Sequence, residues 1–267
     1  MKKYKNFNFI MGVILTGLVV LIAIIGCFYT PYDPDAMDAV AKNSGISMDH
    51  WMGCDNFGRD IFSRIMEGIR NTFLISLFTV AIGTIVGVLI GAVTGYFGGW
   101  LDEILMRIND ALFAFPSVLL ALVVISLLGT GMFRVTLALG IAFIPSFARI
   151  VRSEIKKQVT QDYVESAKLM GAGNFRIIFV HILPNILPVL LSSIMIGFNN
   201  AVLAEAGLSY LGIGVQPPDA SLGRMLSEAQ SFLFSMPWYA LFPGTVIVIM
   251  VLGFALMAEG ITQAQMK

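Results

Sequence analysis

The sequence predicts an all-α fold: a polytopic membrane protein with about six transmembrane helices in a single domain, residues 1–267. Hydrophobic residues make up 57% of the chain and charged residues 13%, whereas soluble domains carry about 25% charged residues. The charges are clustered, which leaves long apolar stretches between them. Because a bilayer requires backbone hydrogen bonds to close within each crossing segment, these stretches favour helices.

Six apolar stretches give six predicted spans. A helix needs roughly 20 apolar residues to cross the hydrocarbon core. The second span lies in a stretch without charged residues between Asn71 and Leu101. The predicted spans cover about residues 9–29, 72–97, 104–128, 133–150, 186–206 and 238–258.

The distribution of Lys and Arg predicts the orientation. Lys2, Lys3 and Lys5 precede an apolar run from Phe7 to Tyr29, which is longer than the apolar core of a signal peptide and is read as a retained first span. With the N-terminus inside, eleven of the 17 Lys and Arg residues fall in inside segments and six in outside segments. This bias predicts cytoplasmic N- and C-termini.

Composition argues against several kinds of ligand. A net charge of zero gives no reason to expect nucleic acid as a partner. Cys27 and Cys54 are either unpaired thiols or one disulfide, and with His50 and His181 they are too dispersed for a metal site. No glycine is followed by lysine, so the phosphate-binding loop of ATPases is missing and no cofactor is expected in this chain.

Two longer loops are expected on the outer face. Residues 30–71 begin with a turn-rich segment, and residues 212–237 contain a predicted short amphipathic helix capped by Ser221. This helix either covers the mouth of a pathway or lies on the membrane surface.

The cytoplasmic loop, residues 151–187, is too long for a simple connector. A first helix is predicted to begin at Thr160 or Gln161. It carries Asp162 and Glu165 in its first turns, where the helix dipole favours negative charge. The loop therefore predicts ordered structure rather than a linker.

A glycine elbow divides this loop into two short amphipathic helices. The sequence Gly171-Ala172-Gly173 ends the first helix, and a second helix, capped by Asn174, ends or bends at Pro184. An exposed apolar face on a cytoplasmic helix requires a partner groove. Three residues of the first helix are predicted to share such a face: Tyr163, Ala167 and Met170.

The same loop resembles the EAA loop of bacterial ABC-importer permeases. Glu165-Ser166-Ala167 is followed after three residues by Gly171, and after nine more by His181-Ile182-Leu183-Pro184. The usual pattern has Ala in place of Ser166 and Ile in place of His181, and the spacing is kept. In that family the loop is a coupling helix that docks on the ATP-hydrolysing subunit. The resemblance implies ATPase-coupling roles for Asp162, Tyr163, Glu165, Ser166, Ala167, Met170, Gly171 and Ala172.

Further motifs, up to about residue 260, resemble one branch of these permeases, the dipeptide, oligopeptide and nickel permeases, and in particular their second (C-type) subunit. Gly58-Arg59-Asp60 precedes the second span, and Gly95-Tyr96-Phe97-Gly98-Gly99-Trp100-Leu101-Asp102 follows it. Glu205-Ala206-Gly207-Leu208-Ser209-Tyr210-Leu211-Gly212 follows the fifth. Cys54 stands where this branch usually has Thr.

This resemblance implies a location and a set of partners. It implies a multi-pass protein of the bacterial cytoplasmic (inner) membrane, surrounded by lipid, with ATP hydrolysis in other subunits and no enzymatic activity of its own. The implied partners are a homologous second permease, two ATP-binding subunits and an extracytoplasmic solute-binding protein. Dipeptides, oligopeptides, nickel and metal chelates all remain open as substrates.

Three residues within the spans are candidate pathway residues. Asp110 either pairs with Arg107 or lines a pathway, and Glu205 faces a pathway, another subunit or the membrane interface. Pro116 produces a kink that serves either packing or a pathway.

Two other functions compete with an importer permease. A stand-alone secondary transporter typically shows internal repeats and charged relays at the midplane, and neither is evident in the sequence. A membrane enzyme would need a nucleophile and base, or a His-Glu-x-x-His motif, which the sequence lacks. Uptake that depends on ATP rather than on an ion gradient would separate the importer from the secondary transporter.

Overall fold

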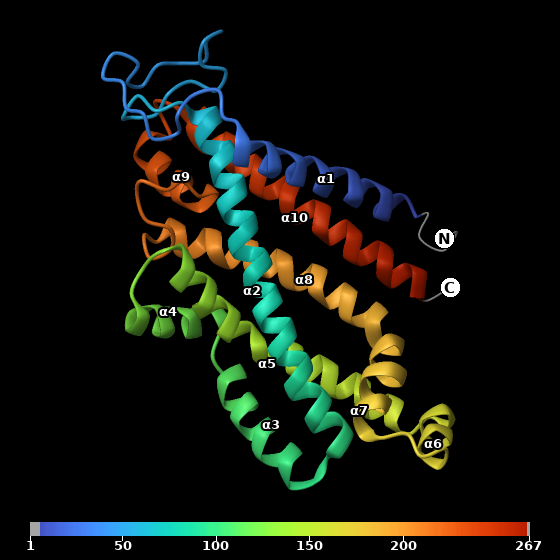
Figure 1. Ribbon diagram of the computed structural model, residues 1–267. Coiled ribbons are helices and arrows are strands. Elements are labelled where there is room, and N and C mark those ends of the chain that lie inside the picture. Colours follow the sequence, from blue (N-terminus) through green and yellow to red (C-terminus); the bar gives the residue numbers. More distant parts are fainter. Residues whose placement is uncertain (1–5, 266–267) are drawn as a thin grey trace.

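The computed structural model describes residues 6–265 and confirms the all-α fold (Figure 1). Within these residues, extended pairing is limited to one isolated bridge between Cys54 and Asp60. The helices in chain order are α1 (Phe7–Phe28), α2 (Ile61–Phe97), α3 (Gly99–Phe113), α4 (Ser117–Leu128), α5 (Met132–Val159), α6 (Asp162–Leu169), α7 (Asn174–Arg176), the π-helix η2 (Ile177–Ile182), α8 (Leu183–Tyr210), α9 (Leu222–Ala229), the 3-10 helix η3 (Gln230–Phe232) and α10 (Pro237–Gln265).

Five described helices are long and apolar enough to cross a membrane, and there are six crossings if α3 and α4 together form one. Several extend beyond their predicted spans. α2 begins at Ile61 rather than at residue 72, because the Asp60 carboxylate accepts a hydrogen bond from the Ser63 backbone N–H and caps the helix. α5 continues past the predicted end at residue 150 to Val159.

The close approach of α2 and α5 forms the centre of the bundle. Glycines recur at every fourth position of α2 from Gly83 to Gly95, on the face toward α5. A Cβ atom added to Gly87 would lie only 2.5 Å from the Cβ atom of Phe147. Small residues at this spacing allow membrane helices to pack backbone against backbone.

The predicted third span over residues 104–128 is sharply bent in the structure. α3 and α4 meet at an angle of 90°. Pro116 stands at this break, where its missing N–H and its restriction on Phe115 prevent a continuous helix. By contrast, α5 passes through Pro145 without interruption.

Helix α3 is attached to α5 by ion pairs. The Asp102 carboxylate accepts from Arg152 Nε at 2.5 Å and from Lys156 Nζ at 2.8 Å. These contacts fix the orientation of α3 beside the C-terminal half of α5.

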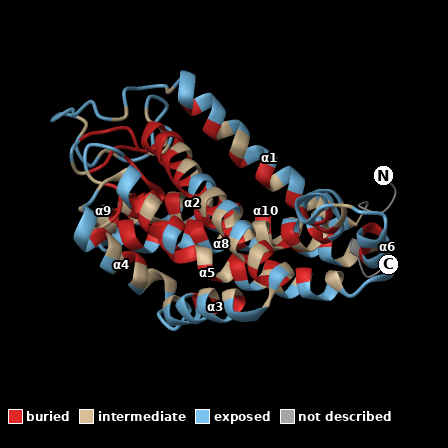
Figure 2. Cartoon of the chain, turned by 60° about the horizontal axis from the view of Figure 1, so that its bottom comes forward, coloured by how far each residue is buried: buried red, intermediate tan, exposed pale blue. Residues whose placement is uncertain are grey.

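Helices α1 and α10 form a second layer of the bundle. Gly12 and Gly253 bring their backbones together, and α10 packs on α8 through the stacked rings of Phe198 and Phe254, 3.9 Å apart. Figure 2 shows that the outer side of α1 is exposed, whereas buried residues concentrate on α2, α5 and α8.

The predicted short helix after Ser221 is confirmed as α9. The Ser221 hydroxyl accepts a hydrogen bond from the Arg224 backbone N–H. Leu222, Met225 and Ala229 are buried against α8 and α10. The helix is therefore built into the bundle and does not lie free on a membrane surface.

Candidate functional site

The first candidate site is α6, the short helix that projects from one end of the bundle (Figure 1). Val164 and Ala167 are buried and attach it to the bundle. The Tyr163 hydroxyl donates to Gln158 Oε1 at 2.8 Å, which links α6 back to α5. Asp162 and Glu165 lie in the first turn, where they are exposed and favoured by the helix dipole.

A Schellman motif forms the glycine elbow after α6. The Ala172 N–H donates to the carbonyl of Ala167, and the Gly171 N–H donates to the carbonyl of Lys168, both at 3.0 Å. Gly171 has a φ of +82°, a conformation that side chains disfavour. The prediction of a glycine-dependent turn at this position is confirmed.

The elbow presents exposed apolar side chains. Leu169 is 84% exposed, Met170 81% and Phe175 79%. Phe179, also exposed, lies parallel to Phe175 with ring centroids 6.5 Å apart. We call seven of the exposed residues of this region the α6 surface: Asp162, Glu165, Ser166, Leu169, Met170, Gly171 and Phe175.

One detail of the predicted loop is wrong. Tyr163, Ala167 and Met170 do not form one exposed face, because Ala167 is buried while Met170 points outward. At Pro184, where the second helix is predicted to end or bend, the helix does not end but continues from the π-helix η2 into α8.

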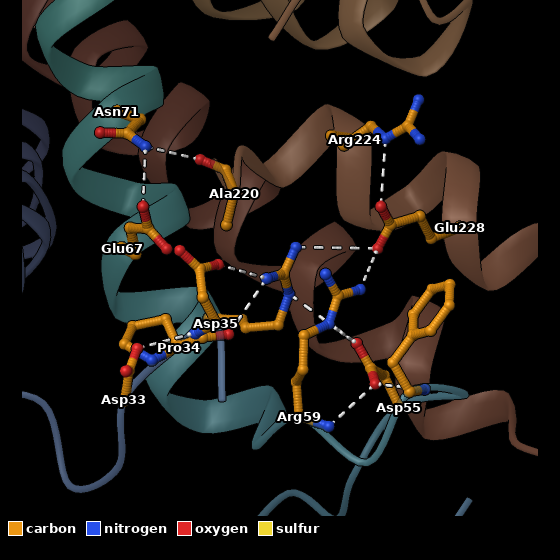
Figure 3. A network of polar contacts seen from close by, with 12 residues as sticks. Asp33, Pro34, Asp35, Asp55, Arg59, Glu67, Asn71, Ala220, Arg224 and Glu228 are labelled. Atoms are coloured by element: carbon orange, nitrogen blue, oxygen red, sulfur yellow. Dashed lines mark hydrogen bonds and ion pairs between the residues drawn. The ribbon is translucent and has the colours of Figure 1, made fainter. Parts of the chain in front are cut away.

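At the opposite end of the bundle lies a network of buried charges that was not predicted from the sequence (Figure 3). Arg59 Nε lies 2.6 Å from Asp55 Oδ2, and Arg59 Nη2 lies 3.0 Å from Glu228 Oε2. Arg64, 1% exposed, lies within 4 Å of both carboxylates. The Tyr239 hydroxyl also donates to Glu228.

This network joins three separate parts of the chain. Arg64 Nη1 donates to the carbonyl oxygen of Pro34, and Glu228 also accepts from Arg224 of α9. Burial by itself lowers the pKa of the Arg59 guanidinium, but Asp55 and Glu228 outweigh burial and raise that pKa. The loop between α1 and α2 is thereby fixed to α2, α9 and α10.

The structure also places the three candidate pathway residues. Asp110 accepts from Arg149 at 2.6 Å, whereas Arg107 pairs with Glu103, so the expected Asp110–Arg107 pair is corrected. The Asp110–Arg149 pair joins α3 to α5. Pro116 is exposed at the bend between α3 and α4.

Glu205 lies inside the chain and faces no open surface. Its side chain is fully buried, and Ser209 Oγ donates to Glu205 Oε1 at 2.7 Å. Ser209 in turn accepts from the Val215 N–H. In this conformation Glu205 therefore supports the loop that follows α8 and does not line a pathway.

A cavity of about 520 Å³ lies between α4, α5 and α8. Sequence reasoning missed it, although polar residues inside the predicted spans were a usable signal. Its lining residues are Ser117, Val118, Phe143, Ser146, Phe147, Ile150, Ser193, Ile196, Gly197, Asn200, Leu203 and Ala204.

Comparisons with known proteins agree with this architecture. Residues 87–265 match the family described as the binding-protein-dependent transport system inner membrane component. The chain is 38% identical to a dipeptide transport system permease protein of Alkalihalophilus pseudofirmus over 260 residues, 97% of this chain and 86% of the relative. It is 41% identical to a glutathione transport system permease protein of Pectobacterium atrosepticum, over 94% of this chain and 85% of the relative.

A third relative, a dipeptide transport system permease protein of Haemophilus influenzae, is 37% identical over 97% of this chain and 90% of its own length. These three matches each cover more than nine-tenths of this chain. They confirm the family resemblance and argue against the alternative function, a stand-alone secondary transporter. This chain belongs to the binding-protein-dependent permeases, the transmembrane components of ABC importers.

Proposed function

We propose that this chain forms one half of a pathway for short peptides and is driven by two ATP-binding subunits. A homologous second permease supplies the other half, and an extracytoplasmic solute-binding protein delivers the cargo. The names of the relatives, dipeptide and glutathione permeases, support peptides over nickel and metal chelates. ATP hydrolysis is assigned to the partner subunits.

The α6 surface carries this proposal. Its apolar side chains Leu169, Met170 and Phe175 are exposed beside the carboxylates of Asp162 and Glu165. Such a combination suits a groove on a partner protein, where the apolar groups leave water and the carboxylates meet cations at the rim. We assign this groove to the ATP-binding subunit.

The connections of α6 suggest how its movement reaches the membrane. Two residues separate α5 from α6, and the elbow leads through α7 and η2 directly into α8. When ATP binding draws two ATPases together, a displaced α6 tilts both helices. Because α5 and α8 line the 520 Å³ cavity, this tilt changes access to it.

We further propose that both termini are cytoplasmic. The N-terminal end of α1, the C-terminal end of α10 and α6 lie toward the same end of the bundle (Figure 1). If α6 meets the ATPases, that end is inside and the buried charge network is outside. The excess of Lys and Arg in the same segments supports this orientation.

Co-purification with the ATP-binding subunits tests the coupling role. Met170→Asp places a charge in the proposed groove, and we expect recovery of the ATPases to fall at least tenfold while the chain stays in the membrane. Met48→Asp is the matched control, since Met48 is 94% exposed in the segment between α1 and α2, away from α6. Gly171→Asp is expected to behave like Met170→Asp. Normal ATPase recovery and normal uptake in both α6 variants would refute the assignment.

Thiol labelling tests the orientation. Cys54 is buried, and its burial raises the pKa of the thiol, so Cys54 cannot report the side on which it lies. In a Cys27→Ser background, Val40→Cys should react with a membrane-impermeant maleimide in intact cells. Met170→Cys should react only after permeabilisation. The reverse pattern would show that the chain is inverted.

A further inference from the structure

The cavity between α4, α5 and α8 is lined by polar groups that the fold does not use. Across the described residues 6–265, the side chains of Ser117, Ser146 and Asn200 make no hydrogen bond. Each comes from a different helix of the cavity wall. Ser193 donates to the Val189 carbonyl of its own helix at 2.9 Å, which leaves its oxygen free to accept.

A second hollow, on the α10 side, provides a contrast. It has a volume of about 540 Å³ and lies against Leu233, Leu241 and Val248. Its hydroxyl belongs to Thr245, which donates to the Leu241 carbonyl at 2.7 Å, as hydroxyls in membrane helices usually do. That hollow suits contact with lipid chains.

The cavity with free polar groups does not suit contact with lipid. Ser146 and Asn200 lie within the predicted spans 133–150 and 186–206, so this surface falls within the membrane. A polar group there that faces hydrocarbon without a partner is strongly unfavourable. The face lined by Ser117, Ser146 and Asn200 therefore needs a polar partner from outside this chain, which water or cargo supplies during the transport cycle.

The chemistry of the lining indicates the class of cargo. The twelve lining residues include hydroxyl and amide groups but no carboxylate, imidazole, thiol or basic side chain. Hydroxyls and amides both donate and accept, as a peptide backbone requires. Transition metals prefer imidazole, thiolate and carboxylate ligands, which this wall does not offer.

We infer that Ser117, Ser146 and Asn200 line this chain's half of the translocation pathway and hydrogen-bond the backbone of a short peptide. Because the wall is uncharged, it accepts peptides irrespective of the charge of their side chains. Phe143, Phe147 and Ile150 supply apolar contacts around these groups. This inference rests on the proposed peptide function and assigns that function its residues in this chain.

Thiol accessibility in the assembled importer tests the location, with no need for transport. In a Cys27→Ser background, Asn200→Cys is compared with Thr245→Cys, using a charged, water-soluble methanethiosulfonate reagent. We expect Asn200→Cys to react at least tenfold faster. Equal, slow rates at the two positions would overturn the pathway assignment.

Uptake into proteoliposomes tests the chemistry, with alanyl-alanine, lysyl-alanine and aspartyl-alanine delivered by the binding protein. The combined variant Ser117→Ala, Ser146→Ala, Asn200→Leu should lower uptake of all three about tenfold or more, since three hydrogen bonds are removed. Asn200→Asp should favour lysyl-alanine over aspartyl-alanine about tenfold relative to the unmodified chain. Ser126→Ala, whose hydroxyl bonds within α4, is the control and should change nothing.

The outcomes separate this inference from the function on which it rests. If the unmodified importer takes up peptides and all variants match it, the cavity assignment is wrong and the peptide function stands. If the unmodified importer takes up Ni²⁺ and no peptide, both the proposed function and the backbone-binding role are wrong.

Discussion

The side chains at the two ends of the bundle differ in whether they are buried within this chain. At the end with α9, Arg59 and Arg64 are almost completely buried, and their partners all belong to this chain. At the end with α6, Leu169 and Met170 are more than four-fifths exposed. Charge is enclosed at one end, and apolar surface is left open at the other.

This difference separates a fixed scaffold from an incomplete interface. A buried charge network is stable only in the geometry that pairs every member, so the loop between α1 and α2 has little freedom to move. Exposed apolar side chains need no fixed partner geometry within the chain. They stabilise the protein only when a partner covers them and removes them from water. We therefore expect substitutions at the first end to affect folding and those at the second to affect assembly.

The largest expected effect is on stability, from Glu228→Ala. This change removes an acceptor shared by Arg59, Arg224 and the Tyr239 hydroxyl. Because buried guanidinium groups are left underpaired, the free energy of unfolding should fall by about 3–5 kcal/mol. Unfolding of the purified chain by SDS in mixed micelles measures this change.

Glu103→Ala is the matched control for Glu228→Ala. Glu103 also pairs with an arginine, Arg107, but both side chains are exposed, and such pairs contribute about 0–1 kcal/mol. Equal losses of unfolding free energy in the two variants would show that the buried network stabilises the chain no more than an exposed ion pair does.

The predictability of the two ends from sequence was also unequal. The α6 elbow was predicted closely, because Gly171 and the residues around it obey local rules of helix capping that need no knowledge of the tertiary fold. The charge network was not predicted. Asp55 and Glu228 are far apart in sequence, and their meeting depends on how α9 packs against α2.

The same limit explains the other errors. The apolar stretches predicted the crossing helices, but hydropathy could not show that Pro116 produces a 90° break while Pro145 is accommodated. Hydropathy also does not predict that Asp110 pairs with Arg149 on another helix. It does not predict that Glu205 is buried beneath the loop after α8. Each outcome is decided by contacts between segments.

A smaller effect is expected at the elbow itself. Gly171→Ala introduces a side chain at a φ of +82°, which costs about 1–2 kcal/mol although no neighbouring atom lies within 4 Å. The Schellman turn should open more often, so the Ala172 amide, bonded to Ala167, should exchange its hydrogen roughly five- to thirtyfold faster.

Gly173→Ala is the control for that experiment. Gly173 also has open space around it, but its φ is −70°, which any residue adopts. If the Ala172 amide exchanged its hydrogen equally fast in both alanine variants, the left-handed conformation of Gly171 would not be what stabilises the elbow.

The smallest expected effect on the chain alone is that of Leu169→Ser. Leu169 is 84% exposed and makes few packing contacts that the substitution could remove. The free energy of unfolding of the purified chain should therefore change by less than about 0.5 kcal/mol. If α6 docks on the ATPase as proposed, the same change should weaken assembly of the importer, because the leucine would then be covered by the ATPase groove. Val164→Ser, at a fully buried position of the same helix, should instead destabilise the purified chain. A Leu169→Ser variant that destabilised the purified chain as much as Val164→Ser would mean that α6 is completed within this protein, and the contrast between the two ends would be lost.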